Sequence, residues 1–100
     1  MEKRKAHYPI TTLKRLVAEG RVSFTMTAVA GGTAMGFAAE EMLDVVSSLA
    51  SRNLYKSMTS HADHKVWHDV YHVDTERGVV YLKLTIVEDL LIISFKEKDE

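Results

Sequence analysis

The sequence predicts an α+β fold in which helices pack on one face of a twisted antiparallel sheet. Three observations lead to this prediction. Apolar residues recur at helical spacing before residue 50, the period becomes two from Leu54 onward, and short polar turns separate the later segments. Helices followed by a run of sequential strands are typical of an α+β protein with an antiparallel meander. With 100 residues, we expect one domain spanning 1–100.

The first predicted helix has Thr12 as its N-cap and stops at Gly20. Its apolar positions follow helical spacing and are Leu13, Leu16 and Val17. Residues 22–24 (VSF) have the composition of a short strand.

A second helix is expected to start near Thr25 or Thr27, and the Gly31–Gly32 pair should weaken its middle or end it. A third should begin around residues 38–40, because Glu41 and its neighbour Glu40 favour a first helical turn. Its apolar stripe is typical of a core-facing helix and consists of Met42, Leu43, Val45, Val46 and Leu49.

Strands are predicted at residues 54–60 and 65–73, followed by a hairpin over 79–96. If Glu88 and Asp89 form the hairpin turn, the numbers of paired residues sum to 177. Alternation then gives each strand one apolar side and one mixed side. The apolar pairs are Leu82 with Phe95 and Leu84 with Ile93, and the mixed side pairs Tyr81 with Lys96.

The pairing of 65–73 with the first hairpin strand has two possible registers. A sum of 152 places His68 opposite Leu84 on the apolar face. A sum of 153 places His68 opposite Thr85 and His72 opposite Tyr81. The sequence leaves both registers open.

Composition restricts the class of protein. The net charge is −1, with +3 in residues 1–20 and −3 in residues 84–100, so nucleic-acid binding would require local clusters. The chain has no cysteine, no apolar run near the ~20 residues of a membrane helix and no apolar segment typical of a secretory signal. We therefore expect a cytoplasmic protein without a membrane partner.

Histidines cluster near the middle of the chain, together with Asp63, at positions 61, 64, 68 and 72. On a helix His64, His68 and His72 would share one face and suit zinc. The segment is β-patterned, however, and strand geometry places only His68 and His72 on a common side. We expect neither a metal nor a cofactor, and a histidine-rich metal protein remains the alternative that elemental analysis would test.

A second constellation is polar and lies on the predicted strands: Lys56, His68, Tyr81, Lys83 and Lys96. Strand lysines are commonly solvent-facing, and a strand tyrosine commonly packs its ring. On an open sheet face, the same groups could bind RNA through stacking and phosphate contacts. Cleavage by the RNA 2′-hydroxyl needs a base, cations and an acid, and His68 can exchange a proton near pH 6.5.

Four motifs resemble the bacterial motility quorum-sensing regulator toxins: LYKSMTS (54–60), DHKVWHDVY (63–71), YLKLTI (81–86) and LIISFKEK (91–98). The opening MEKR and the segment KRLVAEG (14–20) match in the same register, so the resemblance covers practically the whole chain. It implies a RelE-like bacterial ribonuclease toxin fold. It also implies a metal-independent mRNA interferase cleaving at GCU-type sites, with growth arrest, persistence and biofilm formation as the associated physiology.

The resemblance implies partners as well. These are an mRNA substrate and a cognate MqsA-like antitoxin with a zinc-binding domain and a helix-turn-helix domain. Operator DNA would be bound only through the antitoxin complex, which gives autoregulation of the operon.

The family's catalytic positions fall here on Lys56, His68, Tyr81 and Lys96. Relatives have glutamine where this chain has His68, so His68 is either a proton-exchanging residue or only a polar donor. For RNA binding we expect Tyr55, Lys83 and Lys98. The alternative function is a non-catalytic module that binds RNA or adds a strand to a partner's sheet.

Overall fold

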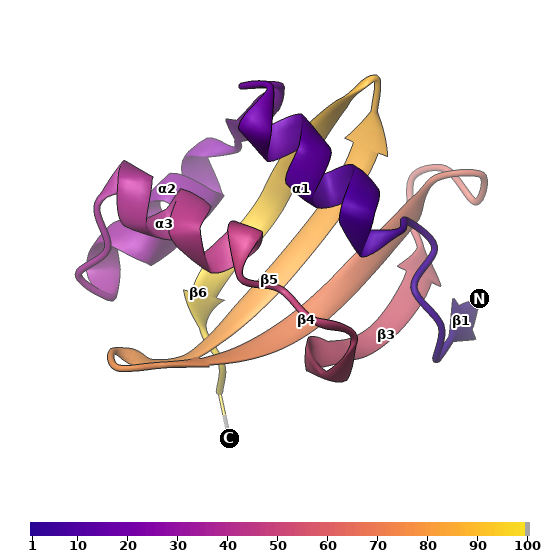
Figure 1. Cartoon of the computed structure of the whole chain (residues 1–100). Helices are drawn as coiled ribbons and strands as arrows, with labels where there is room; N and C mark the ends of the chain where they lie inside the picture. The colour runs from indigo at the N-terminus through magenta and orange to yellow at the C-terminus, as the bar shows by residue number, and fades with distance from the viewer. Residues whose placement is uncertain (100) are drawn as a thin grey trace.

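The computed structural model describes residues 1–99, which contain one six-stranded sheet. Figure 1 shows the sheet with helices lying over it. The sheet order is β1-β3-β4-β5-β6-β2, with β2 parallel to β6 and the other pairs antiparallel. The helices are α1 (Ile10–Ala18), α2 (Met26–Ala34), α3 (Ala39–Ser47) and the short 3-10 helix η1 (Ser51–Asn53). The strands are β1 (Glu2–Lys3), β2 (Val22–Phe24), β3 (Leu54–Thr59), β4 (Trp67–Thr75), β5 (Gly78–Val87) and β6 (Asp89–Glu97). The predicted α+β class is confirmed.

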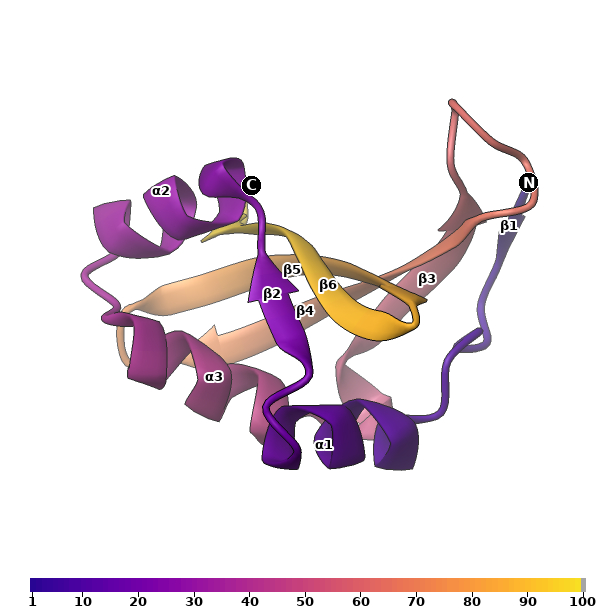
Figure 2. The same cartoon turned by 90° about the horizontal axis from the view of Figure 1, so that it is seen from above.

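The core lies between the sheet and helices α1 and α3, and Ala28 of α2 joins it. Figure 2 shows α1 and α3 together on one side of the sheet. Inward-facing residues of β4, β5 and β6 pack there against Leu13, Leu16, Val46 and Leu49, which are all at most 2% exposed. The opposite side of the sheet is therefore the side left available for ligands. No helix within residues 1–99 is long and apolar enough to cross a membrane.

Helix α1 begins earlier than predicted. Pro9, not Thr12, is the N-cap, and the Pro9 carbonyl accepts from the amides of Thr12 and Leu13. Proline at this point costs no helical hydrogen bond, which is why the helix extends back to it. The predicted stop is confirmed, because Gly20 has a φ of 73° in a Schellman motif.

Helix α2 continues through the glycine pair that we expected to weaken or end it. Thr25 caps the helix, since its side chain accepts from the amide of Ala28. A Cβ on Gly31 would overlap the backbone oxygen of Phe95, so the glycine allows the helix to approach β6 closely. Tertiary contact thus outweighs the intrinsic helix propensity. Helix α3 starts at Ala39, as predicted.

The β5–β6 hairpin agrees with the predicted register only in the half that lies away from the turn. Tyr81 pairs with Lys96 and Leu82 with Phe95, as expected. Beyond Lys83 the register shifts by one, so Leu84 pairs with Ile92 and not with Ile93. The turn is also tighter than predicted, because Val87 pairs with Asp89 and Glu88 alone is at the tip with a φ of 66°. The shift turns Leu90, Ile92 and Phe95 inward together.

The β4–β5 pairing adopts the register that sums to 153. His72 pairs with Tyr81, and Asp69 pairs with Leu84. Of the two registers that the sequence allowed, this one keeps His68 and His72 off the apolar face. Strand β4 starts at Trp67, two residues later than predicted, and extends to Thr75.

The N-terminal arm, residues 1–9, was not predicted to join the sheet. Its first residues form β1 and pair with β3. The buried carboxylate of Asp69 holds the arm further along by accepting from the amides of His7 and Tyr8, at 3.0 and 2.9 Å. The hydroxyl of Ser57 donates to the same carboxylate. Three donors thus compensate the burial of this charge.

Candidate active site

The polar residues of the uncovered sheet face come from four strands. Cross-strand partners share a face, so the pairing places Lys56 beside Val70, Val70 beside Lys83 and Lys83 beside Ser94. The next row places His72 beside Tyr81 and Tyr81 beside Lys96. The four residues predicted to be catalytic, Lys56, His68, Tyr81 and Lys96, therefore all belong to one face.

A β-bulge in β3 adds Tyr55 to this face. Leu54 pairs with Tyr71 on the covered side, whereas Lys56 already pairs with Val70 on the open side, so Tyr55 is the extra residue. Its ring stacks on His72 with centroids 4.4 Å apart and planes at 19°. Without the bulge, simple alternation would have placed Tyr55 and Lys56 on opposite faces.

An open pocket of about 480 Å³ lies at this row of residues. Its lining residues are Tyr55, His72, Tyr81, Lys96, Lys98 and Asp99. The centroids of the His72 and Tyr81 rings are 5.9 Å apart, and Lys96 Nζ lies 5.2 Å from the centre of the Tyr81 ring. Aromatic walls with an ammonium group at one end suit a nucleotide, whose base stacks and whose phosphate is anionic.

Further cations flank the pocket on the β3 side. Lys56 Nζ lies 5.3 Å from the centre of the Tyr55 ring and forms an ion pair with Glu2 at 3.2 Å. The Arg4 guanidinium lies 5.8 Å from the same ring, and its Nη1 donates to the Tyr55 carbonyl. The N-terminal arm therefore brings both a cation and a competing carboxylate to the site.

His68 and Lys83 are on the same face but outside the pocket. His68 pairs with Met58 and lies four residues from His72, which corresponds to about 13 Å along the strand. Lys83 occupies the row between them, and both side chains are half-buried. The structure thus brings Tyr81 and Lys96 together with Lys98 and Tyr55, but it does not bring His68 to them.

Burial lowers the pKa of both strand histidines. For His68 the next contribution is the Lys83 ammonium, and the Asp69 carboxylate opposes it. For His72 burial is again the main cause, followed by the Lys98 ammonium. Both imidazoles are therefore neutral at pH 7, the form that accepts a proton.

A second pocket, of about 490 Å³, lies between the N-terminal arm and β3, with Arg4, Lys5 and Tyr71 among its lining residues. The Tyr71 hydroxyl is buried and lacks a hydrogen-bond partner among residues 1–99. Burial, with the Asp69 carboxylate, raises the pKa of Tyr71 to about 12, so this phenol does not exchange protons near neutral pH. The first pocket is therefore the better candidate for acid–base chemistry.

The histidine cluster of the sequence does not converge. Across residues 1–99 no three His, Cys, Asp or Glu side chains are close enough to bind one metal ion. His61, Asp63 and His64 are exposed in the connection before β4, away from the pocket.

Sequence reasoning missed two residues of the site, His72 and Arg4. His72 appeared only as a neighbour of Tyr81 in one of two open registers, and the pairing with Tyr81 was the signal that could have identified it. Arg4 reaches Tyr55 through an arm that pairs with β3 more than 50 residues away in sequence, and no local pattern indicates this contact.

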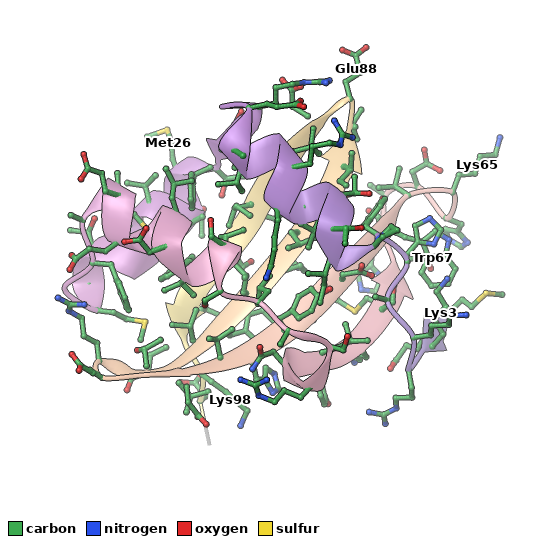
Figure 3. The ribbon with its side chains drawn as sticks, in the orientation of Figure 1. Lys3, Met26, Lys65, Trp67, Glu88 and Lys98 are labelled. Carbon is green, nitrogen blue, oxygen red and sulfur yellow. The ribbon has the colours of Figure 1, made fainter. Side chains whose placement is uncertain are left out.

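Figure 3 shows Lys98, which lines the pocket, far from Glu88 at the hairpin tip.

Comparison with known proteins gives two matches. The family described as "Motility quorum-sensing regulator, toxin of MqsA" matches residues 5–97. A relative from Escherichia coli (strain K12), named mRNA interferase toxin MqsR, is 42% identical over 98 residues. That alignment covers 98% of this chain and 100% of the relative. The region matched by the family includes four lining residues of the pocket, Tyr55, His72, Tyr81 and Lys96.

Proposed function

The chain belongs to the family of motility quorum-sensing regulator toxins, and from this premise we propose that it is an mRNA interferase. The relative from Escherichia coli carries that activity in its name and aligns over its full length. The proposed reaction is metal-independent cleavage of mRNA at GCU-type sites, with the RNA 2′-hydroxyl as the nucleophile. The toxin would act in a type II toxin–antitoxin system.

One observation supports this function most directly. Tyr81 and Lys96 are cross-strand neighbours beside an open pocket, and the ammonium group lies 5.2 Å from the centre of the phenol ring. A cleavage by the 2′-hydroxyl requires cationic stabilisation of the phosphorane and a proton for the leaving 5′-oxygen. Lys96 meets the first requirement and Tyr81 the second.

The remaining predicted residues extend the site along the RNA. Lys56 contacts an adjacent phosphate, and Tyr55 offers a ring on which a base can stack. Lys98 adds positive charge at the pocket, and Lys83 adds it in the neighbouring row of the same face. His68 either assists proton transfer or only donates a hydrogen bond to RNA passing over β4.

Incubation of the purified protein with GCU-containing RNA in the presence of EDTA tests the activity. We expect cleavage at GCU and fragments that end in 2′,3′-cyclic phosphate and 5′-hydroxyl groups. An RNA of the same length in which each GCU is scrambled serves as the control. Intact RNA from a folded sample would refute the proposal.

The role of His68 has its own test. If His68 titrates during catalysis, His68→Gln changes the dependence of the cleavage rate on pH. If His68 only donates a hydrogen bond, the wild type and His68→Gln share one pH–rate profile.

The proposed partner is an MqsA-like antitoxin, encoded with the toxin, that has a zinc-binding domain and a helix-turn-helix domain. The toxin would be neutralised by it and would reach operator DNA only within that complex, which regulates the operon. The family description names the toxin as that of MqsA, which supports this pairing. Co-expression of the two proteins should abolish RNA cleavage, and continued cleavage by a stable complex would contradict neutralisation.

A non-catalytic binding module is the second candidate, because an open sheet with aromatic and cationic side chains can bind RNA without cleaving it. Lys96→Ala and Tyr81→Phe separate the two. Loss of cleavage with antitoxin binding retained supports the enzyme. Undiminished toxicity of both variants in cells would support the module.

A further inference from the structure

We propose that His72, at the centre of the pocket on β4, accepts the proton of the RNA 2′-hydroxyl. This assignment rests on the proposed function, since it names the base of that same cleavage. It differs from the expectation from sequence, in which His68 was the candidate for proton exchange or acted only as a polar donor.

The position of His72 supports the assignment. Its ring is stacked on Tyr55 at 4.4 Å and faces Tyr81 at 5.9 Å, so it lies between the two phenols that form the pocket walls. Tyr81 pairs with both His72 and Lys96, so a phosphate bound between the Lys96 ammonium and the Tyr81 ring lies one strand from the imidazole. His68 lies about 13 Å further along the strand and does not line the pocket.

The other lining groups are poor proton acceptors. Lysine side chains only donate hydrogen bonds, and tyrosine as a residue type loses its proton near pH 10. Asp99 lies beyond the end of β6 with its side chain exposed, and carboxylates as a class are weak bases at neutral pH. Within the described lining of the pocket, the imidazole is therefore the group best suited to accept a proton at pH 7.

The cations around His72 act in the same direction, and Asp99 is the one carboxylate among the described lining residues of the pocket. Tyr55 faces it from β3, Tyr81 from β5, and Lys96 and Lys98 from the end of β6, with Arg4 beyond Tyr55. Burial and the Lys98 ammonium lower the pKa of His72, which keeps the imidazole neutral near pH 7.

The reaction balances with groups of the pocket. The 2′-oxygen forms a bond to phosphorus while its proton passes to His72. The bond from phosphorus to the 5′-oxygen breaks, and that oxygen takes a proton from Tyr81. Exchange through water then returns a proton from His72 to Tyr81. The products are a 2′,3′-cyclic phosphate and a 5′-hydroxyl.

Two variants separate proton transfer from stacking. His72→Gln removes the ring and the base, whereas His72→Phe keeps a ring against Tyr55 but cannot accept a proton. In single-turnover cleavage of a short GCU-containing RNA with EDTA, from pH 5 to 8.5, both variants should be slower by about 10²–10⁴-fold. The wild-type rate should fall at acid pH, and both variants should lose this fall. A His72→Phe rate near wild type would mean that stacking alone is required, and would overturn the assignment.

A modified substrate distinguishes a base from an acid. RNA with sulfur in place of the scissile 5′-oxygen has a leaving group that needs no proton donor. If His72 is the base, His72→Gln remains slow on this RNA. Recovery of the wild-type rate would identify His72 as the acid and refute the proposal.

His64→Gln is the matched control, because His64 is an exposed histidine outside the pocket. It should retain the wild-type rate and pH profile, and circular dichroism with urea unfolding should show that all variants fold. Wild-type cleavage with an unimpaired His72→Gln would overturn this assignment alone. Failure of the wild type to cleave would overturn the proposed function and this assignment with it.

Discussion

The two faces of the sheet differ in how their polar groups are paired. On the covered face the buried carboxylate of Asp69 accepts hydrogen bonds from three donors, two of them backbone amides of the N-terminal arm. On the open face Lys96 lies over the Tyr81 ring, beside a pocket that admits solvent. Successive residues of one strand, β4, contribute to both faces. Polar groups that are satisfied within the protein stabilise it, and polar groups that face a pocket remain available to a ligand.

The largest expected effect is on the rate of RNA cleavage and comes from a substitution on the open face. Lys96→Ala should slow RNA cleavage by about 10²–10³-fold, because a cation that stabilises the transition state is lost. Its free energy of unfolding should change by no more than about 0.5 kcal/mol, since the side chain is exposed. Single-turnover cleavage and urea unfolding measure the two quantities, with exposed Lys65→Ala as the comparator. A large loss of stability in Lys96→Ala would break the distinction between the faces.

Asp69→Ala tests the covered face. It removes the acceptor of three hydrogen bonds, and we expect a loss of about 3 kcal/mol in the free energy of unfolding. Asp74→Ala is the matched control, because Asp74 is an exposed aspartate of the same strand. Urea unfolding followed by circular dichroism measures both. Equal midpoints for the two variants would show that the Asp69 network adds no stability.

Tyr71→Phe should change the free energy of unfolding less than Asp69→Ala does, and in the opposite direction. The Tyr71 hydroxyl is buried without a partner among the described residues, so its removal should stabilise the protein by about 1 kcal/mol. Tyr81→Phe, on the open face, should leave the free energy of unfolding unchanged. Destabilisation of Tyr71→Phe in urea unfolding would mean that the hydroxyl is hydrogen-bonded in solution.

The smallest effect is a dependence of stability on pH. The pKa values of His68 and His72 are lowered in the folded state, so the unfolded state binds protons more readily. Stability is then fully present above pH 6.5 and falls as the pH drops through the folded-state pKa values. Urea midpoints at pH 7.5 and 5.5 should differ less for the double variant His68→Gln/His72→Gln than for the wild type. An unchanged difference would assign the acid sensitivity to other groups.

Alternation and turn length sufficed to predict that Tyr81 and Lys96 are neighbours, because the outer half of the hairpin is regular. They failed where a single residue is inserted, at Ile93 in β6 and at Tyr55 in β3. Neither insertion is marked by glycine or proline, and each depends on packing that involves distant segments. The register between β4 and β5 also depends on packing. The loop before Gly78 is compatible with two pairings, and the sequence alone does not choose between them.

Local patterns were least informative where the N-terminal arm meets the sheet. Arg4 and Glu2 reach the site only because Asp69 fixes residues 7 and 8 and because β1 pairs with β3. Such contacts between residues far apart in sequence are settled by the complete fold. Family resemblance supplied the candidate residues, and the sheet geometry separated His68 from the pocket that contains His72.

Both edge strands of the sheet are short, and one edge is also covered by a helix. On one side β1 has only two residues. On the other, β2 has three, and helix α2 covers β6 beyond it, where the Phe95 carbonyl lies against Gly31. A broad sheet with exposed backbone margins tends to recruit further strands from other copies and to aggregate. This chain can therefore expose the open face of its sheet to a large polymer such as RNA. Its short edge strands leave few unpaired backbone groups to which another copy could add a strand.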